Sequence, residues 1–96
     1  MEYIRVRWLH KNPDEPILLY IELDDERWET RKLEIFRDGR IGRASSLEEA
    51  GGSRLGVELV PSLTDINGDP EFQAESISES EFDCAWQVAD GASLLS

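Results

Sequence analysis

An Asp-Gly pair at Asp38-Gly39 separates two runs of strand-like residues, and it constrains the fold more than any other feature. The run before it covers Arg27–Arg37 and the run after it covers Arg40–Ala44. Such a pair between two strands is typical of a β-hairpin with a type I′ turn, in which both central residues need positive φ. The sequence therefore predicts an antiparallel sheet that contains this hairpin.

Two further strands are predicted upstream of the hairpin. Tyr3–Leu9 alternates apolar and charged residues, which is typical of a half-buried strand with one wet face. Ile17–Leu23 is apolar on both faces and predicts a central strand that is covered on both sides. Asn12–Pro16 contains two prolines and predicts the loop between these strands, and Asp24–Glu26 predicts a tight connection to the next one.

The segment after the hairpin shows weaker patterns. Ser45–Gly56 is rich in glycine and serine and is expected to be a loop. Val57–Val60 predicts a short fifth strand at the sheet edge, because Pro61 stops its pairing. Ser62–Ile66 is expected to form one helical turn.

The C-terminal part predicts a helix. Ser78 and Glu81 have the spacing of a capping box, in which the serine side chain accepts the glutamate amide. Apolar residues then recur on one helical face: Phe82, Ala85, Trp86 and Ala89. We expect a helix over 79–89 that ends at Gly91. The chain is therefore predicted to be one α+β domain over 1–96, with an antiparallel four- to five-stranded curled sheet and a C-terminal helix packed on one face.

The composition bounds the compartment. A hydrophobic content of 40% with three Trp, three Phe and two Tyr in 96 residues excludes a disordered acidic tail and suits one core. Cys84 is the only cysteine, so no internal disulfide is possible and a reducing compartment is expected. The N-terminus lacks a signal-peptide pattern, and no uncharged run is long enough for a membrane span. The expected location is the cytoplasm.

The net charge of −11 is unevenly distributed. Residues 1–43 have a net charge of −1, whereas residues 44–96 contain Arg54 against eleven acidic residues. Such a field repels phosphate backbones and anionic lipids, which argues against direct binding of nucleic acid or membranes. It favours encounter with a cationic protein partner, and the alternative is that the charge only keeps the protein soluble. The oligomeric state stays open.

Residues that could carry catalysis are scarce. His10 lies near Asp14 and Glu15 and could be a general base, but no nucleophile accompanies it, and a plain loop histidine is the alternative. Cys84 has acidic neighbours in the predicted helix, which oppose formation of a reactive thiolate. We therefore predict that the protein is not an enzyme.

Cofactor and metal motifs are also incomplete. One His and one Cys are too few for a zinc site, and the segment 65–69 resembles a calcium loop whose ligand spacing is wrong. The glycine-rich segment 51–56 lacks the lysine of a phosphate-binding loop. No cofactor and no metal are predicted.

The remaining candidates are residues for partner binding. Trp28 has charged neighbours and could anchor an interface, although packing under the sheet edge is the alternative. Acidic residues cluster in two places that could contact a basic protein, or could simply be solvated faces. The candidate partner-binding residues are Asp24, Asp25, Glu26, Trp28 and Glu29 at the predicted connection, and Asp65, Asp69, Glu71 and Glu75 in the C-terminal half.

Several segments together resemble an uncharacterised family of small bacterial proteins that is known as a domain of unknown function. They are YIRVRWLH, DEPILLYIELDDERWETRKLEIFRDGRIGRAS, PSLTDINGDPEF and ISESEFDCAW, which together extend from Tyr3 to Trp86. The shared motifs are structural, and no catalytic residue is carried over. Members of that family look like stand-alone domains that are sometimes near secreted polymorphic toxins, so the resemblance implies an immunity role for some of them.

These observations lead to three hypotheses. The first is a small acidic immunity protein that neutralises a cognate toxin by occlusion, with its acidic surface meeting the basic groove of a nuclease-like toxin. The second is a mimic of nucleic acid that inhibits or regulates a DNA- or RNA-binding protein, which needs carboxylates in a regular double row. The third and least favoured is an enzyme that uses His10.

Overall fold

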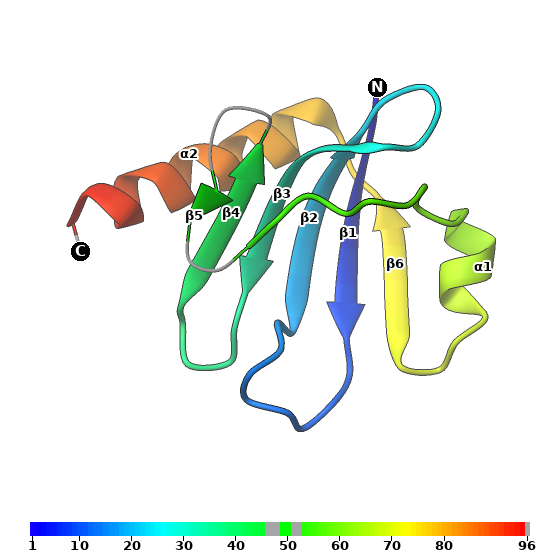
Figure 1. Cartoon of the computed structure of the whole chain (residues 1–96), viewed down its shortest axis with the longest axis horizontal. Coiled ribbons are helices and arrows are strands. Elements are labelled where there is room, and N and C mark those ends of the chain that lie inside the picture. Colours follow the sequence, from blue (N-terminus) through cyan, green and yellow to red (C-terminus); the bar gives the residue numbers. More distant parts are fainter. Residues whose placement is uncertain (46–48, 51–52, 96) are drawn as a thin grey trace.

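In the computed structural model, the strands form one antiparallel sheet in the order β5-β4-β3-β2-β1-β6 (Figure 1). The structure describes the backbone of residues 1–45, 49–50 and 53–95, and the side chains of 1–45 and 53–89. The strands are β1 Glu2–Trp8, β2 Leu18–Leu23, β3 Glu29–Ile35, β4 Ile41–Ser45, β5 Glu49–Ala50 and β6 Phe72–Ser76, and the helices are α1 Leu63–Asn67 and α2 Glu79–Leu95. The predicted α+β class with a C-terminal helix on an antiparallel sheet is confirmed.

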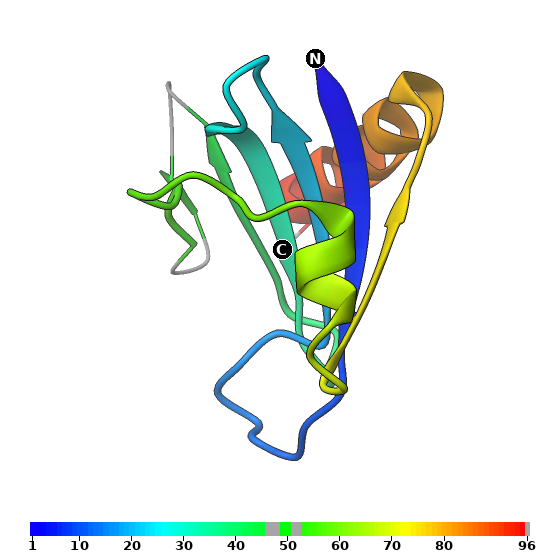
Figure 2. The ribbon, with the colours of Figure 1, turned by 90° about the vertical axis from the view of Figure 1, so that its right-hand side faces the viewer.

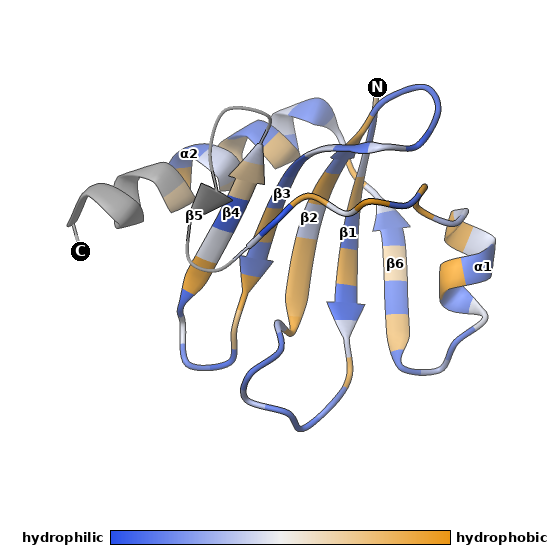
Figure 3. Cartoon of the chain, in the orientation of Figure 1, coloured by the Kyte–Doolittle hydropathy of each residue, from blue (hydrophilic) through white to orange (hydrophobic). Residues whose placement is uncertain are grey.

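The two helices lie on opposite sides of the sheet (Figure 2). Alternation along β1 places Ile4 and Val6 on one face, where they pack with Ile21 and Leu23 of β2. Residues of α1 and the segment before it cover this cluster, among them Val60, Leu63 and Ile66. Because successive strand residues point to opposite faces, the same alternation gives β1 a polar second face, and Figure 3 shows the two classes alternating along the strand.

The other face of the sheet is covered by α2. Phe82 is completely buried there, with its ring centroid 5.4 Å from that of Tyr3. Ser78 begins the helix as predicted, since its Oγ accepts the Glu81 amide at 3.1 Å. The helix continues through Gly91 to Leu95, so the predicted end at Gly91 is wrong. A glycine lowers helix stability by only about 1 kcal/mol relative to alanine, which does not force a stop.

The predicted hairpin between β3 and β4 is confirmed, but its turn type is wrong. The Gly39 amide donates to Phe36 O at 3.0 Å, and the Phe36 amide donates to Arg40 O at 2.9 Å. Gly39 has φ +91, whereas Asp38 does not have positive φ. The loop is therefore a three-residue connection, a turn followed by a left-handed residue, rather than a two-residue type I′ turn.

The sheet edge beside β1 is formed by β6, which the sequence did not predict. Val57–Val60 was expected to be an edge strand, and instead it is a bent segment that lies outside the sheet. In β6, Phe72 and Ala74 alternate with Gln73 and Glu75, but Ala, Gln and Glu do not favour strands, so the pattern was weak. The Asn67 side chain accepts from the Ala74 amide at 2.6 Å and donates to Ala74 O at 2.9 Å, and so occupies this edge.

The loop that was expected over Ser45–Gly56 also contains strand structure. Ser45 ends β4, and Glu49–Ala50 form β5, which pairs with β4. The rest of this expectation falls partly on residues 46–48 and 51–52, which lie outside the described part.

Candidate protein-binding surface

The connection between β2 and β3 is a short hairpin loop with an unusual residue at its end. The Arg27 amide donates to Asp24 O at 2.9 Å, and the Asp24 amide donates to Trp28 O at 3.0 Å. The Asp24 side chain accepts from the amides of Glu26 and Trp28, both at 2.9 Å. Arg27 has φ +72, a left-handed conformation that a non-glycine residue adopts at a cost of roughly 1–2 kcal/mol.

Contacts of the Arg27 side chain offset this cost. Its Nε donates to Val60 O at 2.9 Å, its Nη2 donates to Pro61 O at 2.7 Å, and its Nη1 forms an ion pair with Glu2. The Val60 amide returns a hydrogen bond to Arg27 O at 2.9 Å. Arg27 therefore connects the hairpin, β1 and the segment before α1.

A second contact fixes the same segment further upstream. Glu29 Oε1 accepts from the Gly56 amide at 2.7 Å and lies 3.1 Å from Lys32 Nζ. Residues 57–59 are therefore held at both ends beside the start of β3, where Trp28 lies.

Three apolar side chains are exposed in this region. The exposed fractions are 39% for Trp28, 88% for Val57 and 52% for Leu59. Exposed carboxylates of Asp25, Glu26 and Glu58 are their neighbours in the sequence. We call these residues and Asp24 the acidic hairpin surface: Asp24, Asp25, Glu26, Trp28, Val57, Glu58 and Leu59.

The structure brings together only some of the predicted partner-binding residues. Asp24, Asp25, Glu26 and Trp28 lie on the acidic hairpin surface, although Asp24 caps the loop and Asp25 pairs with the N-terminal amine at 3.2 Å. Glu29 points away from solvent, with 11% of its side chain exposed. Its carboxylate is used within the fold, in the contacts with Gly56 and Lys32.

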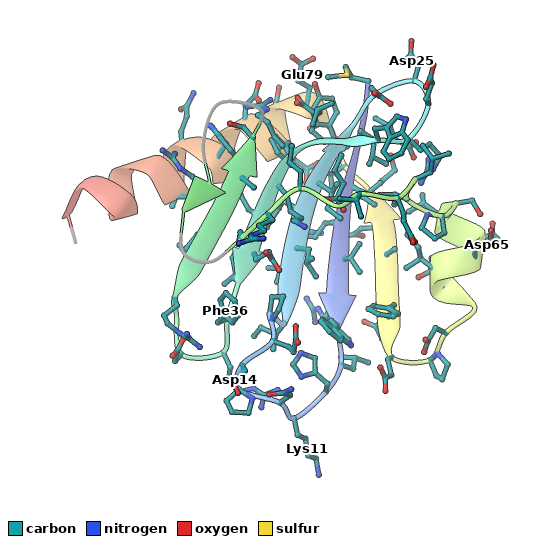
Figure 4. The ribbon with its side chains drawn as sticks, in the orientation of Figure 1. Lys11, Asp14, Asp25, Phe36, Asp65 and Glu79 are labelled. Atoms are coloured by element: carbon teal, nitrogen blue, oxygen red, sulfur yellow. The ribbon has the colours of Figure 1, made fainter. Side chains whose placement is uncertain are left out.

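The second predicted cluster is divided between separate places. Asp65 is exposed on α1, and Asp69 caps the next turn by accepting from the Glu71 amide at 2.9 Å (Figure 4). Glu71 Oε2 accepts from Trp8 Nε1 at 3.4 Å. Glu75 forms an ion pair with Arg5 on the α2 side of the sheet, which raises the pKa of Arg5. The four carboxylates therefore do not form one continuous patch.

Sequence reasoning missed Val57, Glu58 and Leu59 as surface residues. The same segment was predicted to be an edge strand, in which alternate residues would have been buried. Val57 and Leu59 alternate with Glu58 as in a half-buried strand, so the local sequence holds no signal that both apolar side chains are exposed.

A buried ion pair supports the strands behind the hairpin. Glu22 on β2 is 6% exposed and accepts from Arg31 Nε at 3.0 Å and Nη2 at 2.6 Å. Thr30 Oγ1 donates to the same carboxylate at 2.8 Å. The Arg31 guanidinium lowers the pKa of Glu22 and outweighs burial, which raises it, and Thr30 lowers it further. Arg31 also bonds Asp83 of α2 at 3.0 Å, so this group joins the helix to the sheet.

The residues considered for catalysis are engaged with the backbone or exposed. His10 Nε2 lies 2.7 Å from Pro16 O, and its Nδ1 accepts from the Asn12 amide at 3.0 Å. The predicted carboxylate neighbours Asp14 and Glu15 are not its partners. Cys84 is exposed on α2. In the part of the chain that the structure describes, no three His, Cys, Asp or Glu side chains gather in a group that could hold a metal ion.

Comparison with known proteins identifies a family for this chain but no function. Among the described residues, no helix has the length and apolarity that crossing a membrane requires. No curated protein and no solved structure matches the chain. A family model described as Domain of unknown function (DUF6881) matches residues 2–91. The chain therefore belongs to the DUF6881 family of domains of unknown function.

Proposed function

We propose that this domain binds a basic protein through the acidic hairpin surface, acting in the cytoplasm as an immunity protein that neutralises a toxin by occlusion. The observation that carries this proposal is the exposure of Trp28, Val57 and Leu59 among carboxylates on a loop that Arg27 holds in place. Tryptophan is one of the three residue types most enriched at the hot spots of protein interfaces.

The chemistry of the surface suits a protein partner. An apolar centre with a charged rim is the usual anatomy of an interface, and the rim here is acidic. The net charge of −11 adds a long-range attraction for a basic partner and increases the rate of encounter. A basic groove of a nuclease-like toxin would meet the carboxylates, while Trp28 fills an apolar recess beside that groove.

The apolar centre also favours this proposal over mimicry of nucleic acid. A mimic must present carboxylates in the regular rows that phosphates occupy. Asp24, Glu29 and Glu75 are engaged with amides or cations of the fold itself. The exposed carboxylates of Asp25, Glu26 and Glu58 are interspersed in the sequence with the exposed apolar residues Trp28, Val57 and Leu59, which does not suit a double row of carboxylates.

The experiment is capture of the partner from an extract of the native cells, with mass spectrometry to identify it. We expect Trp28→Ala together with Leu59→Ser to weaken the complex by about thirtyfold or more, as at interface anchors. Val88→Ser is the matched control, because Val88 is 64% exposed on α2, away from this surface. Equal capture of the partner by the wild type, the double variant and the Val88→Ser control would contradict the proposed surface.

Charge and toxicity give two further measurements with the captured protein. Glu26→Gln should slow association at low salt more than Glu15→Gln, which removes an exposed charge at the opposite end of the sheet. The captured protein, expressed alone, should stop growth, and co-expression of the domain should restore it. Tight binding to a protein that does not stop growth would support the proposed binding surface and contradict the immunity role.

A further inference from the structure

A second candidate site lies at the opposite end of the sheet from the acidic hairpin surface. A pocket of about 420 Å³ opens where β1 ends and β2 begins. The residues that line it include two arginines, two aromatic residues and two aliphatic residues: Arg7, Arg37, Trp8, His10, Ile17 and Leu18. Figure 4 shows this end of the molecule at Lys11, Asp14 and Phe36, far from Asp25 and Glu79. Pockets of this size accommodate small organic molecules.

The two arginines of the pocket differ from the paired cations elsewhere. Arg5, Arg27, Arg31, Lys32 and Arg40 each form an ion pair with a carboxylate. In the described part of the chain, neither Arg7 nor Arg37 forms one, and Arg37 donates only to the carbonyl oxygen of His10. No carboxylate is among the described residues that line this pocket. In a protein of net charge −11, the described residues that line this pocket therefore include two cations and no anion.

The walls of the pocket are fixed by hydrogen bonds within the loop between β1 and β2. His10 is held through both ring nitrogens, with Nε2 donating to Pro16 O and Nδ1 accepting from the Asn12 amide. Arg40 donates to Pro13 O at 3.2 Å, which connects the β1–β2 loop to the β3–β4 hairpin. The Trp8 ring lies edge-on to His10, with centroids 4.5 Å apart. A site whose walls are ordered before binding loses less entropy when a ligand enters.

We propose that this pocket binds a small organic anion, in which a carboxylate or phosphate is attached to a flat apolar body. Arg7 and Arg37 hold the acidic group, because a guanidinium binds both carboxylate and phosphate through paired N–H donors. Trp8, Ile17 and Leu18 contact the apolar body. This site is separate from the acidic hairpin surface and does not depend on the proposed protein partner.

The test is an amide NMR titration of the whole chain with 2-naphthoate, 2-naphthyl phosphate and the neutral analogue 2-naphthalenemethanol. We expect saturable shifts in residues 8–18 and at Arg37 with the anions. Loss of a charge-assisted hydrogen bond weakens binding by about tenfold or more, which is the expected difference between naphthoate and the neutral analogue. The stronger of the two anions then identifies the acidic group that the site prefers.

Variants separate a defined site from diffuse attraction. Arg37→Gln and Arg7→Gln should each reduce the affinity for the preferred anion by about tenfold. Lys11→Gln is the matched control, since Lys11 is an exposed cation in the loop between β1 and β2 and does not line the pocket. Equal losses in the Arg37 and Lys11 variants, equal binding of the neutral analogue, or no saturation at about 5 mM ligand would each overturn the proposal. The Trp28→Ala, Leu59→Ser protein should bind the anion as the wild type does, so failure here is distinct from failure of the protein-binding proposal.

Discussion

The hairpin loops at the two ends of β3 share one backbone design and differ in the residue at its most demanding position. In the β2–β3 loop, Asp24 and Trp28 close the hairpin, and in the β3–β4 loop Phe36 and Arg40 do so with the same pattern of hydrogen bonds. The left-handed residue is Arg27 with φ +72 in the first loop and Gly39 with φ +91 in the second.

The residue at this position shows which further role each loop has. A Cβ on Gly39 would meet no atom within 4 Å, so glycine there satisfies only a backbone requirement. At Arg27 the chain accepts a strained backbone because the side chain joins Glu2, Val60 and Pro61 to the hairpin. The first loop is a structural junction that supports an exposed surface, whereas the second leaves its own Arg37 available to line a pocket.

The largest effect on stability is expected at the cross-strand pair that follows the first loop. Glu22 faces Arg31 there, whereas Leu33 faces Arg43 behind the second loop. Arg31→Met leaves the buried Glu22 carboxylate without its cation, and we expect a loss of about 3–5 kcal/mol in the free energy of unfolding. Urea unfolding at pH 7 measures it, with Arg40→Gln as an exposed control that should change little. An Arg31→Met protein as stable as the wild type would contradict the role of the pair.

The same ion pair predicts a pH dependence with a definite sign. The pKa of Glu22 lies below its usual value of 4.5 in the folded protein, mainly because of the bond to Arg31. Its stabilisation is therefore complete above the unfolded pKa and is lost as pH falls through the folded pKa. The stability difference between wild type and Arg31→Met should shrink in acid. A difference that stays constant below pH 4.5 would rule out this contribution.

A smaller effect is expected at the junction itself. Arg27→Ala keeps the left-handed backbone strain and removes the guanidinium contacts with two carbonyls and Glu2. Hydrogen bonds from a charged donor contribute about 1.5–3 kcal/mol each at most, and partial exposure reduces this, so we expect a loss of about 2–3 kcal/mol. Arg37→Ala, in the other loop, should cost much less, because Arg37 makes one exposed hydrogen bond. Equal losses of stability in Arg27→Ala and Arg37→Ala would contradict the role of Arg27 as a structural junction.

The elements that the sequence predicted well are those whose pattern lies in consecutive residues. Ile17–Leu23 was apolar on both faces and became the interior strand β2, and Ser78 with Glu81 marked the start of α2. The strand β6 was missed because it pairs with β1, which is more than sixty residues away, through residues with weak strand preference. Local pattern carries no information about that pairing.

The candidate surface followed the same rule. Asp24, Asp25, Glu26 and Trp28 were recognised because they are consecutive or nearly so. Val57 and Leu59 join them only through the contacts that Arg27 and Glu29 make with the distant segment. Arg7 and Arg37 were not singled out, because their lack of a carboxylate partner is a property of the folded chain. Left-handed φ at Arg27 was equally hidden, since the type of residue gives no hint of it.

The smallest expected effects come from substitutions at the left-handed position of each loop. Gly39→Ala adds a methyl group into open space, so its cost is conformational and should be about 1 kcal/mol. Arg27→Gly removes the strain together with the side chain, so it should be more stable than Arg27→Ala by about the same 1 kcal/mol. Urea unfolding of the four proteins, with wild type as reference, gives both differences. Matching values mean that the two backbones demand the same conformation and that the contacts of Arg27 account for everything beyond it. If Arg27→Gly were no more stable than Arg27→Ala, the left-handed backbone at Arg27 would carry no strain, and its side-chain contacts would stabilise the first loop without offsetting any backbone cost.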